Sequence, residues 1–171
     1  EVIRDILQGC SKPVVIDADA LTALTGNTEI LSRMKCPRII TPHPAEMARL
    51  IDGNASDVDA NRLAFASRYA VEWQTVVVLK GAPTVVAAPD GVAYLNTTGN
   101  EGMATGGSGD VLTGIIAALL GQGLSAADAA VLGVYLHGLA GDLAAEKGKI
   151  GLAAGQISEN LPSARQKVEE E

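Results

Sequence analysis

Three short runs of aliphatic, largely β-branched residues divide the first half of the chain: residues 13–17, 38–41 and 75–79. Polar residues hardly interrupt them, which is typical of strands that are buried on both faces of a parallel sheet. Two further runs, residues 84–88 and 92–95, flank Pro89-Asp90-Gly91, and this spacing predicts an antiparallel hairpin. We therefore expect a sheet that begins with parallel strands and ends in a hairpin.

Apolar residues with helical spacing separate these runs. They predict helices over residues 2–7, 44–50 and 57–71, and a fourth that begins within residues 17–21. Pro44 is well placed to start its helix, and Asp57 or Ser56 to cap the longest one. Because strands alternate with helices, we expect a three-layer α/β/α fold with right-handed crossovers and a mostly parallel sheet.

The last third of the chain reads as helical. A helix that opens at Asp110 and ends at residues 121–123 has one apolar face, formed by Val111, Leu112, Ile115, Ile116 and Leu119. Its Gly114 and Ala118 are left for close packing. Ser125-Ala126-Ala127-Asp128 has the pattern of a capping box and predicts a further helix, with Leu132, Tyr135, Leu136, Leu139 and Leu143 at core spacing. The charged residues 165–171 are expected to fray.

Composition narrows the class of protein. The 171 residues are the length of one domain, and 47% are hydrophobic while only 3% are aromatic, which suits a sheet covered by small-residue helices. A net charge of -7 argues against a nucleic-acid partner. Cys10 and Cys36 lack the spacing of a metal site and favour a reducing compartment. No apolar run has membrane-spanning length, so we expect a cytoplasmic protein without a membrane partner.

A glycine-rich turn precedes the helix at Asp110. Its residues 105–110 include Gly106, Gly107 and Gly109, which allow a ligand to approach the main chain closely. The first amides of the following helix lack internal partners and lie at its positive end, so the turn is suited to a phosphate or a moving phosphoryl group. Asp110 could cap the helix, or it could take a proton from a hydroxyl that is being phosphorylated.

Polar residues follow three predicted strands, at the edge of the sheet where ligands of open α/β folds bind. His43 lies between two prolines that stiffen its backbone, which favours a substrate contact over a structural role. Glu46 suits the first turn of its helix electrostatically, or a functional role. Lys80 is either a solvated surface lysine or a residue that contacts a bound ligand. For Asp17 and Asp19, capping of the next helix is favoured over orientation of a metal ion.

Residues 96–114 resemble the hallmark segment of the ADP/ATP-dependent NAD(P)H-hydrate dehydratases, a branch of the ribokinase-like superfamily. The wider superfamily shares only the small-x-Gly-Asp ending at residues 107–110. The run Thr98-Gly99-Asn100-Glu101-Gly102-Met103-Ala104-Thr105 is typical of the hydrate-repair branch. Thr41-Pro42-His43-Pro44-Ala45-Glu46 and Lys80-Gly81-Ala82-Pro83-Thr84 also match this family, and the similarity extends from Asp17 to Pro162.

This resemblance implies an enzyme that repairs hydrated NADH or NADPH (NADHX or NADPHX, the S epimer). ADP or ATP, with Mg²⁺, would phosphorylate the ring hydroxyl, and the loss of phosphate would restore NAD(P)H. Asp110 would be the base and would also contact the substrate. His43 would position the hydrated nucleotide. Glu46 would hold Mg²⁺ through water. The anion hole would consist of the amides of Gly106, Gly107, Ser108 and Gly109. The nucleotide would be bound by Lys80, Gly81, Ala82, Pro83, Thr84 and Gly109. His137 and Asp142 are expected to be structural, although they also fit the family.

Two departures from the family pattern limit these expectations. Ala154-Gly155-Gln156 stands where the resemblance implies a small-Ser/Thr-Asp element, so no role is assigned there. The family's N-terminal part, with a glycine-rich segment of the substrate pocket, has no counterpart. We expect residues 1–171 to be the C-terminal portion of one domain, inactive without its N-terminal fragment, with a sheet edge left uncovered. The resemblance favours a homo-tetramer and ADP as the phosphoryl donor. It leaves open whether an epimerase domain is fused upstream.

Two other functions remain to be weighed. A ribokinase-like kinase of hydroxymethylpyrimidine or of a thiazole alcohol would share the Gly-Asp turn and release a stable phosphorylated product. Residues 97–105 argue against it, because that run belongs to the repair branch. A non-catalytic nucleotide-binding module is the second alternative, and Asp110 argues against it, because binding alone needs no base at that position.

Overall fold

A five-stranded sheet forms the centre of the molecule in this computed structural model, which describes residues 1–146 and 148–170. The strands follow one another in chain order: β1 (Val14–Ile16), β2 (Arg38–Ile40), β3 (Val76–Leu79), β4 (Val85–Ala87) and β5 (Ala93–Leu95). The pairs β1–β2 and β2–β3 are parallel, and β3–β4 and β4–β5 are antiparallel. The predicted parallel start and the closing hairpin are both confirmed.

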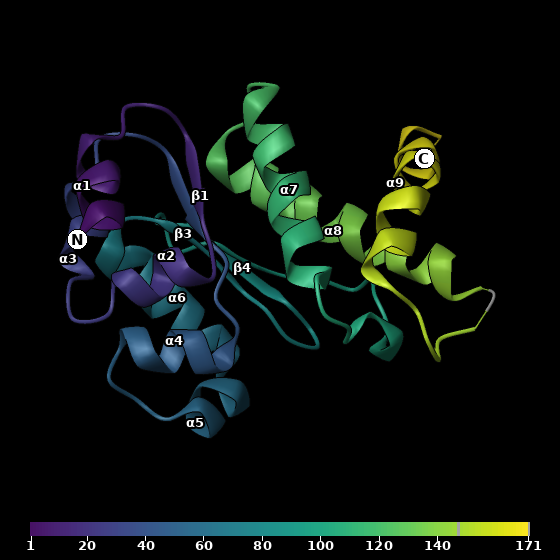
Figure 1. The fold of residues 1–171 in the computed structure, drawn as a ribbon, viewed down its shortest axis with the longest axis horizontal. Coiled ribbons are helices and arrows are strands. Elements are labelled where there is room, and N and C mark those ends of the chain that lie inside the picture. The colour runs from purple at the N-terminus through teal and green to yellow at the C-terminus, as the bar shows by residue number, and fades with distance from the viewer. Residues whose placement is uncertain (147, 171) are drawn as a thin grey trace.

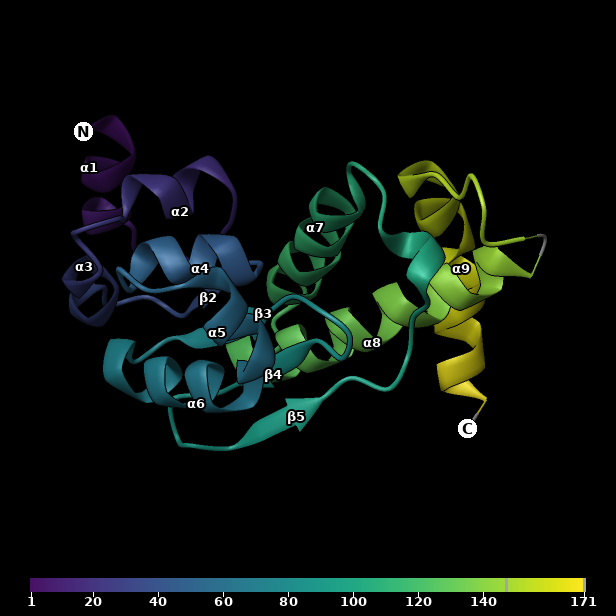
Figure 2. The same ribbon diagram turned by 90° about the horizontal axis from the view of Figure 1, so that it is seen from below.

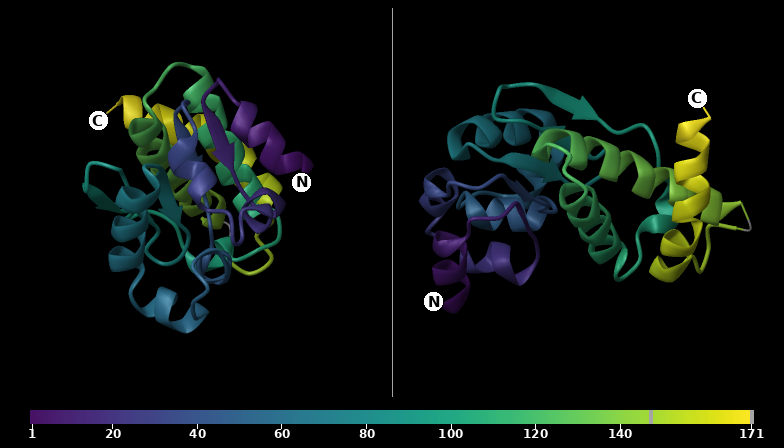
Figure 3. Two further views of the ribbon diagram at one scale, coloured as in Figure 1. Left: turned by 90° about the vertical axis from the view of Figure 1, so that its left-hand side faces the viewer. Right: turned by 90° about the horizontal axis from the view of Figure 1, so that it is seen from above.

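Helices cover both faces of the sheet. On one face lie α1 (Val2–Gly9), α2 (Asp19–Ala23), α3 (Glu29–Arg33), α4 (Pro44–Leu50), α5 (Ala55–Ala60) and α6 (Arg62–Trp73). On the other lie α7 (Ser108–Gly121) and α8 (Ala126–Ala145), as Figure 1 shows. The short helix η1 (Glu101–Met103) precedes α7, and α9 (Ala154–Glu169) packs on α8 beyond the sheet. The N-terminus and α9 therefore lie at opposite ends of the molecule (Figure 3).

The two helical layers have separate cores because side chains alternate along each strand. Ile40 and Val77 point into the core beneath α1 to α6, whereas Ile39, Val76 and Val78 point into the core beneath α7 and α8. All five are buried. Burial on both faces explains why β2 and β3 read as uninterrupted aliphatic runs in the sequence.

Two helix boundaries differ from the prediction. Residues 57–71 do not form one helix, because the chain breaks at Asn61, between α5 and α6. The side chain of Asn54 caps α5 by accepting a hydrogen bond from the Ser56 amide, so neither Ser56 nor Asp57 is the cap. Likewise α7 begins at Ser108, which places Asp110 in the first turn rather than at its opening.

The C-terminal segment also differs from the prediction. Residues 165–169 belong to α9 and do not fray, because Ala164 and Val168 on the same helix pack in the third core. Glu171 lies outside the described residues. In α7, Gly114 and Ala118 are exposed, and a Cβ placed on Gly114 would meet no atom within 4 Å, so the expected close packing is wrong for that glycine. In the described part of the chain, no helix is both long and apolar enough to cross a membrane.

Candidate functional site

Three charged side chains meet at the carboxyl ends of the parallel strands. Lys80 follows β3, and its Nζ lies 3.1 Å from Oδ1 of Asp17, which follows β1. Glu46, in the first turn of α4, places Oε2 3.7 Å from the same Nζ. Only 11% of each carboxylate side chain and 20% of the lysine side chain are exposed. The predicted convergence of these strand ends is confirmed, and Lys80 is a paired, largely buried cation rather than a solvated one.

Asp17 also reaches the helical layer on the other face of the sheet. Its Oδ2 accepts a 2.7 Å hydrogen bond from Oγ1 of Thr113, in the second turn of α7. Burial raises the pKa of Asp17, but the hydrogen bond from Thr113 and the charge of Lys80 outweigh this effect, so the pKa lies below its ordinary value. The favoured capping role is wrong for Asp17, because α2 has no side-chain cap. The carboxylate instead joins Lys80 to α7.

The backbone beside Asp17 is strained. Ala18 has φ 49° and ψ -121°, outside the regions that residues with a side chain favour. Such strain costs on the order of 1–3 kcal/mol and persists only where the surrounding contacts impose it. Here the two bonds of Asp17 fix the chain on one side, and α2 begins directly on the other. Sequence patterns gave no sign of this feature.

The glycine-rich turn has the geometry of an anion hole. Gly107 precedes α7 with φ 86°, and no side chain caps the helix. Within the described residues, the amides of Gly106, Gly107, Gly109 and Asp110 have no hydrogen-bond partner in the protein. Four amides at the positive end of a helix attract an anion. The Ser108 amide, which was also predicted to belong to the hole, instead donates to the Thr105 carbonyl at 3.3 Å. The alternative in which Asp110 caps the helix is wrong, because no side chain caps α7; Asp110 is an exposed residue of its first turn.

The turn and the charged cluster are adjacent. A Cβ placed on Gly109 would lie 3.4 Å from Nζ of Lys80, so the lysine ammonium lies against the first turn of α7. Gly107 faces the start of α9, where a Cβ would lie 3.3 Å from Cβ of Ala154. The segment for which no role was predicted therefore forms one wall of the turn.

Polar contacts with α8 hold the segment that leads to the turn. Asp142 accepts hydrogen bonds from the Gly99 amide and from Nδ2 of Asn100, each 2.8 Å long. The Thr98 hydroxyl donates to the Tyr135 carbonyl at 2.9 Å. In Figure 2 this segment runs from β5 along α8 to η1 before it turns back to α7. The structural role predicted for Asp142 is confirmed, and much of the hallmark run serves to dock the turn.

His137, on α8, lies next to the glycine-rich turn. Its Nε2 lies 3.4 Å from Oγ of Ser108, the first residue of α7. Burial lowers the pKa of His137 to about 4, so the imidazole is neutral at physiological pH. His137 was predicted to be structural, and its partly buried position on α8 agrees with that. The sequence pattern did not reveal the contact with the anion hole.

His43 and Glu46 form a reciprocal cap at the start of α4. Nδ1 of His43 accepts from the amides of Ala45 and Glu46, and Oε2 of Glu46 accepts from the His43 amide at 2.8 Å. Pro44 begins the helix as predicted. The favourable first-turn role of Glu46 is thus confirmed, while 45% of the His43 side chain stays exposed. A substrate contact by His43 stays a prediction.

Arg62 fixes the loop that follows Lys80. The Arg62 guanidinium donates to the carbonyls of Ala82 (2.6 Å) and Pro83 (3.3 Å) and pairs with Asp59. A Cβ on Gly81 would lie 2.8 Å from the Arg62 Nε, so the arginine lies against the glycine. Sequence reasoning missed Arg62, because about 20 residues separate it from the loop that it contacts.

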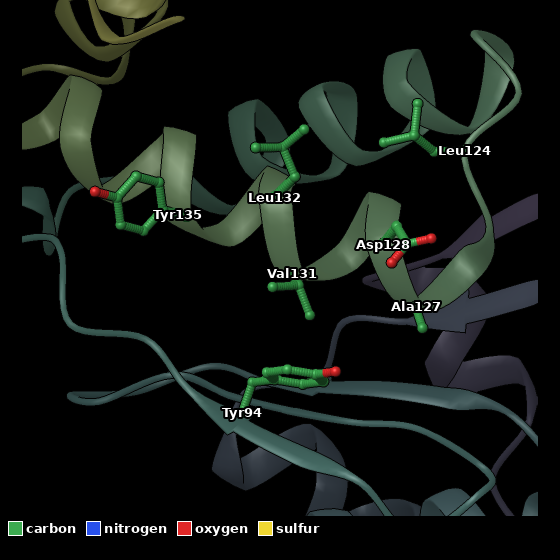
Figure 4. A pocket seen from close by; sticks show the side chains of 7 residues that line it. All are labelled: Tyr94, Leu124, Ala127, Asp128, Val131, Leu132 and Tyr135. Carbon is green, nitrogen blue, oxygen red and sulfur yellow. The ribbon is translucent and has the colours of Figure 1, made fainter. Parts of the chain in front are cut away.

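The structure also has a hollow away from these residues. It has a volume of about 390 Å³ and lies between β5 and α8, with Tyr94 opposite Val131 (Figure 4). Its lining is Tyr94, Leu124, Ala127, Asp128, Val131, Leu132 and Tyr135, all outside the predicted site. Asp128 is occupied in capping α8 through Ser125. The charged cluster and the glycine-rich turn remain the candidate site.

Known proteins share both the sequence and the fold. The bifunctional NAD(P)H-hydrate repair enzyme Nnr of Moorella thermoacetica is 51% identical, in a match that covers 100% of this chain and 32% of that enzyme. The ADP-dependent (S)-NAD(P)H-hydrate dehydratase of Neisseria meningitidis is 48% identical, over 90% of this chain and 52% of that enzyme. The chain thus spans about a third and about half of the length of these curated relatives.

Solved structures of known proteins share the fold of this chain. The ADP/ATP-dependent NAD(P)H-hydrate dehydratase of Bacillus subtilis, co-crystallised with ATP/Mg²⁺, has a TM-score of 0.80 and 36% identity, over 91% of this chain and 55% of that one. A ribokinase-like superfamily protein of Enterococcus faecalis has a TM-score of 0.80 and 32% identity, over 97% and 57%. The ribokinase-like α/β fold is therefore confirmed. The family model described as NAD(P)H-hydrate dehydratase (Carb_kinase) matches residues 2–163, and this chain belongs to that family.

Proposed function

We propose that the charged cluster and the glycine-rich turn transfer a phosphoryl group from ADP or ATP to the ring hydroxyl of the S epimer of hydrated NADH or NADPH. One observation carries the proposal: the Lys80 ammonium lies beside an uncapped helix start whose amides are free to bind an anion. Family membership and the names of the Neisseria and Bacillus relatives support the choice of substrate and donor.

The hydroxyl oxygen attacks the terminal phosphorus of the donor, and Asp110 accepts the hydroxyl proton. The O–P bond to the remaining nucleotide breaks, so ADP leaves AMP and ATP leaves ADP. The free amides of Gly106, Gly107 and Gly109 face the charge that develops on the moving phosphoryl group. The lone pair of the ring nitrogen then expels phosphate, which is a much better leaving group than hydroxide, and the neighbouring ring carbon loses a proton to form the ring C=C bond. The dihydronicotinamide is restored.

The remaining predicted residues position the two substrates. Lys80 and the loop from Gly81 to Thr84 contact the nucleotide, together with Gly109. His43 contacts the hydrate, because its exposed ring borders the cluster. Gly81 and Thr84 hold the loop closed through Oγ1 of Thr84, which donates to the Gly81 carbonyl at 3.0 Å. Gly81, Ala82 and Pro83 are exposed, so a nucleotide can reach the loop.

Mg²⁺ fits the donors at the cluster. It typically keeps several waters and binds through one or two carboxylates and the substrate phosphates. Glu46 supplies one carboxylate at the cluster, and no group of three or more acidic, His or Cys side chains that could enclose a metal exists among the described residues. Glu46 would hold the ion through water, and the ion would neutralise charge on the phosphates.

Three further features belong to the proposal. The enzyme acts in the cytoplasm, which accords with its two free cysteines. It is a homo-oligomer, with a tetramer as the expected form, and the exposed Val92, Tyr94 and Leu95 around β5 support self-association. An N-terminal fragment, which the family resemblance implies, completes the substrate pocket. Intact mass and size-exclusion chromatography with light scattering test the last two.

Recovery of the dihydronicotinamide absorbance tests the proposed reaction. The protein, expressed from its whole reading frame, is mixed with hydrated NADH and ADP, then ATP. We expect the absorbance to return with one phosphate released per NADH. Asp110→Asn should lower turnover by about 100- to 10,000-fold while nucleotide binding changes little. Normal turnover by Asp110→Asn would refute the role of the base.

The two alternatives predict other outcomes. A small-alcohol kinase would bind nucleotide, leave the absorbance unchanged and form a stable phosphorylated product from a hydroxymethylpyrimidine or a thiazole alcohol. A binding module would bind nucleotide and turn over neither substrate. Each of these results would overturn the repair reaction.

A further inference from the structure

We propose that Asp17 and Thr113 are positioning residues that aim the Lys80 ammonium at the anion hole. This inference rests on the proposed function and extends it to two side chains on different layers of the fold. The three residues come from the ends of β1 and β3 and from α7, so the network crosses the sheet edge and ends in the helix whose amides form the hole.

The geometry gives Asp17 two separate tasks. One carboxylate oxygen, Oδ1, accepts from Nζ of Lys80 at 3.1 Å, and the other, Oδ2, accepts from Thr113 at 2.7 Å. With both oxygens engaged, the carboxylate cannot rotate without losing a bond. The aspartate therefore transmits the position of α7 to the lysine.

Lys80 depends on this restraint because its side chain is long. A lysine ammonium is a point charge on a flexible stem, so it needs partners to hold one direction. Glu46 is a second partner but lies farther away, at 3.7 Å. The tighter bond comes from Asp17, and it holds Nζ where a Cβ on Gly109 would lie only 3.4 Å away. A phosphoryl group in the hole would meet this charge on one side.

The direction of the Lys80 ammonium should affect the rate of phosphoryl transfer more than its mere presence in the cluster does. Negative charge spreads over the oxygens of the moving phosphoryl group in the transition state, and a fixed cation stabilises that charge only from the correct direction. If Asp17 or Thr113 is lost, Glu46 still keeps the ammonium in the cluster. Ground-state binding of the nucleotide should then survive, while the rate of transfer falls.

Two matched substitutions test this. Thr113→Val keeps the size and removes the hydroxyl, whereas Thr113→Ser keeps the hydroxyl. Thr113→Val and Asp17→Asn should each lower kcat by about 10- to 100-fold, the range typical when the partner of a reacting group is removed. KM for ADP should change by less than about threefold, because ground-state contacts persist. Thr113→Ser should retain wild-type kcat, as should Thr22→Val, an exposed control on α2.

Three kinetic results would overturn the inference. They are wild-type kcat in both Asp17→Asn and Thr113→Val, equal damage in Thr113→Ser and Thr113→Val, and tighter ADP binding in Asp17→Asn. The last result would mean that Asp17 competes with phosphate for Lys80. Crystal structures of the variants test the inference without an activity measurement. Nζ of Lys80 should move away from Gly109 in Thr113→Val and keep its position in Thr113→Ser. A wild-type protein that fails to restore NADH would refute the proposed function alone, since this structural comparison would still decide the positioning role.

Discussion

The two halves of the candidate site are held in different ways. At the strand ends, side-chain charges hold the geometry: Lys80 is fixed by ion pairs with Asp17 and Glu46. At the start of α7, the backbone itself forms the site, and close packing with docking bonds to α8 holds it in place. One half is therefore sensitive to the loss of a charge, and the other to the addition of an atom.

The docking of the hallmark run on α8 is the sharpest test of the packed half. A Cβ on Gly138 would lie 2.7 Å from the carbonyl carbon of Thr98, which is backbone and cannot move aside cheaply. Gly138→Ala should lower the free energy of unfolding by about 2–3 kcal/mol, as overpacking does, and displace the turn. Urea unfolding and turnover measure both effects. Unchanged stability would show that this contact does not hold the run.

The pH dependence of the free energy of unfolding tests the packed half of the site through His137. Burial lowers its pKa to about 4, so between pH 6.5 and 4 the unfolded chain binds a proton that the folded protein does not. Stability is therefore lost as pH falls through this window, by about 2–3 kcal/mol at pH 4.5.

His137→Gln should remove that part of the acid sensitivity, as measured by urea unfolding at pH 7 and pH 4.5. Thr22→Val, at an exposed position on α2, is the control and should keep the wild-type dependence. If wild type and His137→Gln lose the same stability over this range, the imidazole is not buried as neutral.

Arg62 tests the loop beside the charged half. Its fork holds the carbonyls of Ala82 and Pro83, and lysine cannot reproduce two such bonds. Arg62→Lys should raise KM for ADP by roughly 10-fold with little change in kcat, because the role proposed for the loop is to bind nucleotide in the ground state. Arg68→Lys on the same helix should leave both constants unchanged. A fall in kcat at constant KM would assign Arg62 to the chemical step instead.

Gly114 gives the smallest expected effect and the opposite sign. It lies in α7, but a Cβ there would meet nothing within 4 Å, so only the helix propensity changes. Gly114→Ala should raise the free energy of unfolding by up to about 1 kcal/mol without changing activity. Thermal unfolding checks this. A loss of stability would mean that α7 packs more closely at this position than the structure describes.

The fold was largely readable from the sequence, for physical reasons. Uninterrupted aliphatic runs such as residues 75–79 identify strands buried on both faces, and local signals such as Pro44 and Ser125 mark helix starts. The break at Asn61 was not readable, because residues on both sides of it keep helical spacing. The order of α9 was missed because its many charges mask the few apolar residues that pack.

The site was readable only in part. The glycine-rich turn and the strand-end residues carry local patterns, so Lys80 and Asp110 could be singled out. The bonds from Asp17 to Thr113, and from Arg62 to the loop after Lys80, join residues far apart in the chain. No local pattern encodes such a pair. The contact of Ala154 with Gly107 was missed for the same reason.

A double-substitution cycle between Lys80 and Gly109 tests most directly whether the two halves form one site. Lys80→Met removes the charge, Gly109→Ala crowds the place where it lies, and kcat/KM is measured for both single variants and for the double variant. Residues in contact with a shared ligand couple, whereas independent sites add. We predict a double variant clearly less impaired than the product of the two single effects. A double variant whose loss equals that product would mean that the cluster and the turn act separately, and the single phosphoryl-transfer site would be wrong.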